Sequence, residues 1–316
     1  MTWEFEAVAG PYEFTEGPVW DPERGVVFFT DIPTSTILRY DPDSGGCIEW
    51  ATETNRGNGL ALGPKGNIYC CEMGTDRAGH QVSRYDRDGQ KAVLADAYDG
   101  KRLNSPNDLV FDSEGRLWFT DPDYDDQEDL ELGHLSAYCL DPAGDPGTTD
   151  AADWELARVT HDTTNPNGLL FSRDERTMYI AESPYGEDND RELRAYPVAG
   201  AARREADDGR SQNVVLGEYE VLHDFGPHRG IDGMCLTREG NIVATAGWEA
   251  SGPGGLLYVF TPAGRVLETH PYPADRPTNC AFGGEDLVRC TSPASTAISI
   301  GSRPIESDIR FRRNDE

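Results

Sequence analysis

The sequence predicts an all-β protein, a six-bladed β-propeller with four antiparallel strands in each blade. The prediction rests on one repeated pattern, which consists of a polar residue, a short apolar strand, a turn and a second apolar strand. The pattern occurs six times, and we call its leading polar residues the tips: Glu16, Asn58, Asn107, Asn167, Asp232 and Asn279. By subtraction, the tips are 42, 49, 60, 65 and 47 residues apart, which suits four short strands and loops of variable length.

The clearest copy of the pattern is residues 103–124, which read LNSPNDLVFDSEGRLWFTDPDY. Apolar, β-favouring residues flank a turn at 113–115, and Pro122 then stops the sheet pairing. A third strand is expected after each hairpin, at 37–40, 82–85, 135–138, 193–196, 256–260 and 297–300. Since no helical period interrupts these units, we favour a propeller over the alternative, an irregular β-sandwich.

The length of 316 residues would ordinarily suggest two domains, but a closed ring predicts one domain over residues 1–316. The last unit has only three strands after Asn279. Residues 2–8, TWEFEAV, alternate in polarity and can supply the fourth strand from the other end of the chain. Such an N-terminal closing strand would remove open sheet edges.

The composition excludes several partners. The chain has 57 acidic and 28 basic residues and a net charge of −29, which argues against binding to nucleic acid or an anionic membrane. Lysine occurs only at 65, 91 and 101, and this scarcity favours the cytoplasm of a high-salt organism over a merely acidic, soluble protein. Residues 1–10 lack the features of a signal peptide, and no run of 18 apolar residues occurs, so we expect a cytoplasmic protein. The seven cysteines are expected to be small buried thiols.

The tips carry the chemistry that the sequence predicts. If the six hairpins are equivalent, their tips meet at one mouth of the central channel. Each tip has a side-chain oxygen, and two carboxylates with several amides suit a hard divalent cation, Ca²⁺ best, since Mg²⁺ demands stricter octahedral geometry. The alternative is that the Asn-Gly and Asp-Gly pairs are only turn residues.

The loops after each second strand end at the same mouth. These loops comprise Asp31 and residues 72–80, 121–134, 182–191 and 248–254, and their length and polarity suit a lid over a small polar substrate. We expect substrate contacts from Asn104, Asp121 and Tyr124. The acidic run 125–129 is interpreted as solvated surface rather than a second metal site.

The chain resembles the gluconolactonase/senescence-marker (regucalcin) family of six-bladed propellers, whose relatives include diisopropyl-fluorophosphatase. The motifs that carry the resemblance span nearly the whole chain: EGP at 16–18, NSPND at 104–108, FTDP at 119–122, PNGL at 166–169, DGM at 232–234 and CAFGG at 280–284. The resemblance implies one catalytic divalent ion bound by Glu16, Asn107, Asn167 and Asp232, with Zn²⁺, Mn²⁺ or Mg²⁺ as alternatives to Ca²⁺. Asn58 and Asn279 would then be channel neighbours or substrate contacts. Some sugar lactonases have an arginine where Ser105 stands, so the resemblance does not identify the sugar.

The function that we predict is hydrolysis of a sugar lactone or similar small lactone by a monomer or small homo-oligomer. The ion would polarise the ester carbonyl, and Asp232 would act as general base or, alternatively, as a ligand only. The sequence has no GxSxG, HExxH or P-loop motif that would support other chemistries. Phosphotriester hydrolysis, a metal-dependent lyase or isomerase, and a non-catalytic calcium-binding or protein-docking propeller remain alternatives.

Overall fold

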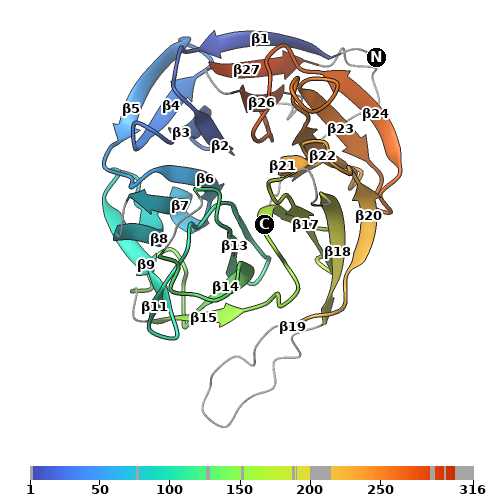
Figure 1. The fold of residues 1–316 in the computed structure, drawn as a ribbon. Coiled ribbons are helices and arrows are strands. Elements are labelled where there is room, and N and C mark those ends of the chain that lie inside the picture. The colour runs from blue at the N-terminus through green and yellow to red at the C-terminus, as the bar shows by residue number, and fades with distance from the viewer. Residues whose placement is uncertain are drawn as a thin grey trace.

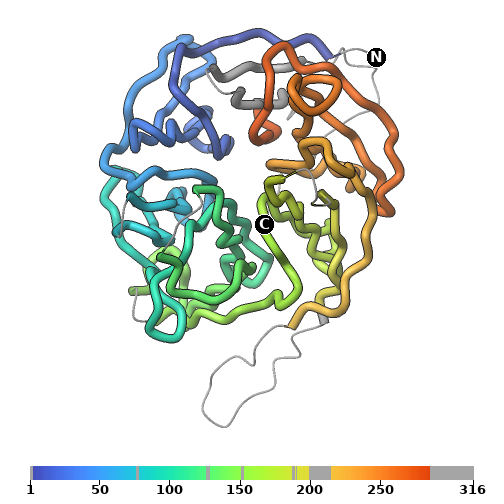
Figure 2. Tube along the Cα trace, in the orientation of Figure 1, coloured from blue at the N-terminus to red at the C-terminus, as the bar shows by residue number. Residues whose placement is uncertain are grey.

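The computed structural model describes residues 3–75, 78–125, 129–150, 153–186, 189, 191–199, 215–284, 289–294 and 297–302. Its sheets are arranged around a central axis (Figure 1). Apart from one short 3-10 turn, η1 (Pro64–Gly66), the described elements are strands. The chain is therefore an all-β propeller, and the tube in Figure 2 follows it round the axis from the blue first strands to the orange ones.

Each sheet is an antiparallel meander, because the alternating apolar residues of successive strands pair through short turns. The first three sheets contain β2 (Thr15–Asp21), β3 (Val26–Asp31), β4 (Thr36–Asp41) and β5 (Gly46–Ala51); β6 (Gly57–Leu62), β7 (Ile68–Thr75), β8 (Ala78–Tyr85) and β9 (Lys91–Ala95); and β12 (Leu109–Phe111), β13 (Leu117–Asp121), β14 (Ser136–Pro142) and β15 (Trp154–Arg158). The next two contain β16 (Pro166–Phe171), β17 (Thr177–Glu182), β18 (Glu192–Ala199) and β20 (Glu220–Asp224); and β21 (Ile231–Leu236), β22 (Ile242–Ala246), β23 (Leu256–Phe260) and β24 (Val266–Pro271).

One sheet joins the two ends of the described chain. It has the order β1 (Glu4–Ala9), β27 (Ala297–Ser302), β26 (Arg289–Ala294) and β25 (Ala281–Gly283). Strand β1 pairs antiparallel with β27, with Glu4 opposite Ser302. Three short strands lie outside the repeated pattern: the ribbon of β10 (Ala97–Tyr98) and β11 (Lys101–Arg102), and β19 (Val215–Leu216), which pairs with β18.

The first strand of each meander lies nearest the axis, as Figure 1 shows for β2, β6 and β21, while β5, β20 and β24 form the rim. Four of the inner strands share an irregularity at the same place. The pairing register shifts just after the tip-bearing end of β2, β6, β16 and β21. A bulge re-aims the side chains beside it, so the tip-bearing end of each inner strand departs from regular sheet geometry.

The core consists of apolar layers between adjacent sheets. In one layer Tyr69, Leu109, Phe119 and Tyr138 pack together between the β6–β9 and β12–β15 sheets. The described cysteines are thiols rather than disulfides. Cys70, Cys71, Cys139 and Cys280 are buried, as expected, whereas Cys47 and Cys235 are only half-buried. None of the described helical residues forms a segment long and apolar enough to cross a membrane.

Candidate metal and active site

The structure places the six tips at equivalent positions around the axis. Glu16, Asn58, Asn167 and Asp232 lie in the inner strands, and Asn107 and Asn279 lie two residues before β12 and β25. All except Asp232 expose only 4–8% of their surface, and the Asp232 side chain exposes 16%. Polar groups this deeply buried need partners, so their contacts define what the mouth can bind.

Glycine follows four of the tips and allows neighbouring tips to approach each other. A Cβ atom on Gly17 would lie 2.4 Å from the Asn58 carbonyl oxygen, and one on Gly233 would lie 2.1 Å from Asn279 Oδ1. The same holds for Gly59 beside Asp108 Oδ1 (2.6 Å) and Gly168 beside the Asp232 carbonyl oxygen (2.3 Å). A side chain cannot fit at such distances, so the glycines of these pairs serve close approach around the ring as well as local backbone geometry.

Hydrogen bonds also connect one tip segment to the next. Thr30 Oγ1 donates to the Asn58 carbonyl oxygen (2.8 Å), and Thr120 Oγ1 donates to that of Asn167 (2.8 Å). Thr278 Oγ1 donates to the Thr15 carbonyl oxygen (2.9 Å) and so links the last tip segment to the first. The tips therefore stand on a rigid, cross-connected frame.

The two tip carboxylates lie close enough to disfavour each other's charge. Burial raises the pKa of Glu16 well above its ordinary value, and the nearby Asp232 raises it further. Burial also raises the pKa of Asp232. Amide side chains offset part of this cost, because Asn279 donates a hydrogen bond to Glu16 and Asn167 donates one to Asp232. Two carboxylates in this setting favour a cation between them.

A third carboxylate, Asp108, belongs to the same group, although the sequence pattern gave it no role. It exposes 8% of its surface, and burial raises its pKa to about 7. Asp232 raises that pKa as well, while a hydrogen bond from the Asn279 side chain lowers it. Its position directly after the Asn107 tip is the signal that the sequence offers for this role.

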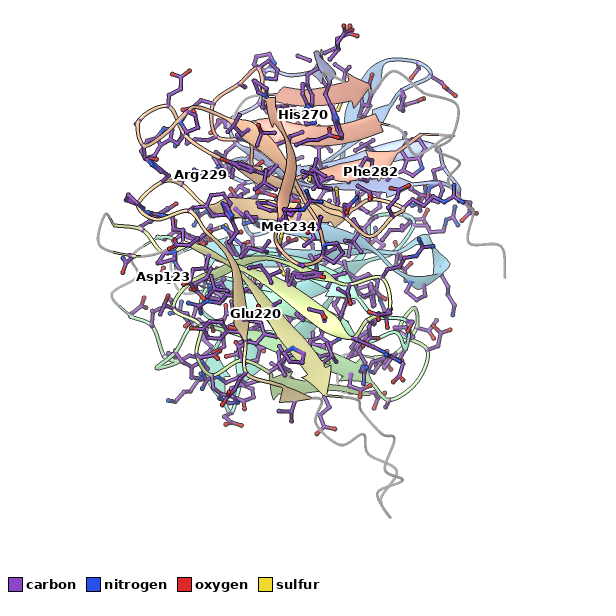
Figure 3. All side chains as sticks on the ribbon, turned by 90° about the vertical axis from the view of Figure 1, so that its right-hand side faces the viewer. Asp123, Glu220, Arg229, Met234, His270 and Phe282 are labelled. Atoms are coloured by element: carbon purple, nitrogen blue, oxygen red, sulfur yellow. The ribbon has the colours of Figure 1, made fainter. Side chains whose placement is uncertain are left out.

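Arg229 is a second residue of the mouth that the sequence did not single out. Its guanidinium donates to Asp232 Oδ2 at 2.5 Å and to the Pro277 carbonyl oxygen at 3.0 Å. The ion pair lowers the pKa of Asp232 and so opposes the effect of burial. Figure 3 shows Arg229 on the same side of the ring as Asp123, which follows β13. This agreement supports the inference that the loops after the second strands open at the mouth that carries the tips.

Aromatic side chains form one wall beside Asn167 and Asp232. The side chain of Tyr124 hydrogen-bonds with Asn167, and its ring packs against Tyr185 with the centroids 5.0 Å apart. Tyr185 is 65% exposed. Burial and the charge of Asp232 both raise the pKa of Tyr124. The predicted substrate residue Tyr124 therefore lies beside the tips, and Tyr185 extends the same wall toward solvent.

Two other predicted substrate residues lie behind the mouth. Asp121 is fully buried, and its carboxylate oxygens accept the N–H groups of Asn104 (2.9 Å) and Ser105 (2.7 Å). Asn104 is 1% exposed, and its side-chain amide donates to the His134 carbonyl oxygen at 3.1 Å. Both residues hold the segment that leads to Asn107. Their burial argues against a direct substrate contact by Asn104 or Asp121, which stays an untested prediction.

The remaining predicted substrate residues are tips. Asn58 Nδ2 donates to Met73 Sδ at 3.4 Å, so this amide faces a thioether as well as the channel. Asn279 bridges the acidic groups, because its side chain hydrogen-bonds with both Glu16 and Asp108. The structure therefore gives Asn279 a defined role in organising the carboxylates.

The donor set suits a hard cation. Within the described ranges, no group of three or more His, Cys, Asp or Glu side chains is arranged to hold a metal ion. Binding would therefore depend on amide oxygens together with the carboxylates of Glu16 and Asp232. Oxygen-only sets of this kind fit Ca²⁺, which accepts carboxylates and amide carbonyls in loose geometry, better than they fit Zn²⁺.

The fold and this mouth define a β-propeller with an oxygen-rich polar site at one end of its axis. The chain belongs to the SMP-30/gluconolactonase/LRE-like family, whose model matches residues 14–290. A gluconolactonase of Zymomonas mobilis is 30% identical over 94% of this chain and 81% of its own length. A pentonolactonase of Haloferax volcanii is 27% identical over 86% of this chain and 78% of its own.

A solved structure agrees with the sequence relatives. The gluconolactonase XC5397 of Xanthomonas campestris superposes with a TM-score of 0.74 at 27% identity, covering 96% of this chain and 90% of its own. The family resemblance predicted from the motifs is thus confirmed. At the level of the family, these relatives support a lactone hydrolase that acts on a small molecule.

Proposed function

We propose that this protein is a metal-dependent hydrolase that opens a sugar lactone or a similar small lactone. The observation that carries the proposal is the convergence of Glu16 and Asp232 with the amide tips at one mouth, where burial raises the pKa of both carboxylates. The lactonase names of the relatives support the reaction class. Glu16, Asn107, Asn167 and Asp232 would hold the ion, and Ca²⁺ suits them best.

Such an ion would act as a Lewis acid on the ester carbonyl. The residues of the chain do the rest. Asp232 takes a proton from the water that adds to the carbonyl carbon, while Arg229 holds the other carboxylate oxygen, Oδ2, in place. The bond between the carbonyl carbon and the ring oxygen then breaks, and the ring oxygen takes the proton from Asp232 and leaves as a hydroxyl group, which regenerates the base. Tyr124 and Tyr185 form a wall against which a sugar ring can pack.

Lactone opening after removal of metal tests the proposal. The protein is treated with a chelator, dialysed, and assayed on a panel of aldonolactones with and without added Ca²⁺, Mn²⁺, Zn²⁺ or Mg²⁺. We expect hydrolysis to be lost without an ion and restored by at least one of them. Full activity in the metal-free protein would contradict metal dependence. Turnover of a phosphotriester but of no lactone would favour the alternative hydrolase.

We also propose that the propeller has six blades closed by β1. The support is the antiparallel pairing of β1 with β27 and the sheet order β1-β27-β26-β25, which gives the last sheet a strand from the start of the chain. Removing residues 1–9 should then expose a sheet edge and lower the melting temperature. An unchanged melting temperature would contradict the closure.

A further inference from the structure

A repeated contact lies behind three of the tips and takes no part in the proposed chemistry. In the sheets that carry Glu16, Asn107 and Asn167, the second strand ends on an acidic residue: Asp31, Asp121 and Glu182. These residues expose 3%, 0% and 0% of their surface. Buried carboxylates are costly, so their partners indicate what they do.

Each of these carboxylates binds the backbone just before its tip. The N–H two positions before the tip donates to it in all three sheets: Phe14 to Asp31 Oδ1 (2.8 Å), Ser105 to Asp121 Oδ1 (2.7 Å) and Asn165 to Glu182 Oε1. The N–H one residue earlier donates as well: Glu13 to Asp31 Oδ2 (3.4 Å), Asn104 to Asp121 Oδ2 (2.9 Å) and Thr164 to Glu182 Oε1 (2.9 Å). One carboxylate thus fixes two successive peptide groups.

We propose that Asp31, Asp121 and Glu182 are positioning residues that set the orientation of the metal-binding oxygens of Glu16, Asn107 and Asn167. The inference rests on the proposed function, because it assumes that these tips bind an ion. Two hydrogen bonds from adjacent peptide N–H groups to one carboxyl group leave the following residue little freedom. Groups that orient metal ligands in this way affect affinity without touching the ion.

The sheet that carries Asn58 shows that the acid alone does not produce this contact. Glu72 stands opposite Gly57, as Asp31 stands opposite Thr15 and Glu182 opposite Pro166. Its described partners are side chains: Asn55 Nδ2 (2.5 Å), Gln81 Nε2 (2.8 Å), Tyr85 OH (2.6 Å) and Lys91 Nζ (3.2 Å). The N–H of Arg56, two positions before Asn58, donates instead to Ser35 Oγ (2.9 Å). Asn58 is not among the four proposed ligands, so Glu72 provides a matched control.

The test compares the same substitution at two equally buried positions. Ca²⁺ alone is titrated by calorimetry into the full-length protein and into its Glu182→Gln, Asp121→Asn and Glu72→Gln variants, and thermal melts report folding. In Glu182→Gln and Asp121→Asn we expect the Ca²⁺ dissociation constant to rise about tenfold or more, the effect typical of groups that orient metal ligands. In Glu72→Gln we expect a lower melting temperature but a change of less than about twofold in that constant, because the ligand segments keep their contacts.

The outcomes separate the two hypotheses. If the parent protein binds no divalent ion, the proposed function fails and the positioning role fails with it. If the parent binds Ca²⁺ and folded Glu182→Gln binds it equally well, or if Glu72→Gln weakens it equally, the positioning role alone is overturned. Should Glu182→Gln not fold, Asp121→Asn decides the question, because Asp121 accepts the N–H groups of Asn104 and Ser105 in the same way. Weaker Ca²⁺ binding by folded Asp121→Asn would support the proposal, and unchanged binding would overturn it.

Discussion

The tips Asn167 and Asp232 belong to neighbouring sheets and are held in place by different contacts, one on the backbone and one on the side chain. In the sheet of β16, β17, β18 and β20, Glu182 binds the backbone before Asn167 and is itself paired with Arg194 at 3.0 Å. In the sheet of β21–β24, Ala246 occupies the position opposite the residue before the tip. There Arg229 binds the carboxylate of the tip Asp232 directly.

Between these two sheets the difference matches the charge of the tip, although the charged tip Glu16 also has a carboxylate, Asp31, on the backbone before it. Asn167 is neutral, so its burial requires only that the amide be correctly placed, and a carboxylate acting on the backbone can do this. Asp232 carries a charge whose burial is unfavourable, so a counter-charge must reach the side chain itself. The same mouth therefore contains three tips whose preceding backbone is held by a carboxylate. It also contains one tip, Asp232, whose own charge is compensated by Arg229.

The largest effect is expected from the charged tip. Asp232→Asn keeps the shape of the side chain but removes the proposed base, so kcat/KM for the best lactone should fall about 100-fold or more, while Ca²⁺ binding weakens but persists. Asp21→Asn is the matched control. Asp21 is 1% exposed and binds the turn N–H groups of Glu23 and Arg24 at the far end of β2. We expect this control to lose stability but to keep its kcat/KM, and equal losses in the two variants would contradict the assignment of Asp232.

Glu16→Gln should affect binding of the ion more than turnover. The variant keeps one amide oxygen as a ligand but loses the charge, so the Ca²⁺ dissociation constant should rise about tenfold. Excess Ca²⁺ should then restore much of the activity, which distinguishes this variant from Asp232→Asn. Activity that is lost and does not respond to added ion would place Glu16 in the chemical step instead.

Arg229→Gln tests whether Arg229 compensates the charge of Asp232. Removing the guanidinium removes the interaction that lowers the pKa of Asp232, so that pKa should rise. Since a general base works when deprotonated, the acid limb of the kcat/KM profile should move to higher pH. The pH profile of Glu182→Gln should keep its acid limb in place, because Glu182 acts on the backbone before Asn167. A shift in both variants, or in neither, would remove the distinction between the two sheets.

The smallest expected effect is a dependence of Ca²⁺ affinity on pH. Burial raises the pKa values of Glu16 and Asp232, so in the absence of metal each keeps a proton at a higher pH than an exposed carboxylate would. An ion must displace those protons, and Ca²⁺ affinity should therefore fall as the pH is lowered from neutrality. Calorimetry in buffers of different ionisation enthalpy should detect the released protons. Affinity independent of pH would mean that the carboxylates are not ligands.

The sequence predicted the strands and the meeting of the tips because both depend on periodicity. Alternating apolar residues locate the strands, and equivalent hairpins place Glu16, Asn167 and Asp232 at one mouth without any knowledge of contacts. The short strands β10, β11 and β19 escaped prediction, since two-residue pairings leave no period to detect.

The sequence could not predict side-chain contacts that depend on the local backbone conformation. The sequence predicts Asp121 in a loop with a substrate contact, yet this residue ends β13 and its carboxylate turns inward to Asn104 and Ser105. Arg229 precedes Asp232 by three residues, and no pattern indicates that its side chain folds back onto that tip. Asp108 belongs to the acidic group through its contact with Asn279, which comes from another sheet, and no sequence pattern indicates that contact.

The central claim is that four tips from four sheets share one ion. Anomalous diffraction from crystals grown with Mn²⁺ tests it directly, because the metal position is located independently of activity. The account predicts one strong anomalous peak within about 2.5 Å of side-chain oxygens of Glu16, Asn107, Asn167 and Asp232. A mouth without a peak in crystals of protein that hydrolyses lactones with Mn²⁺, or a peak bound by other residues, would contradict it.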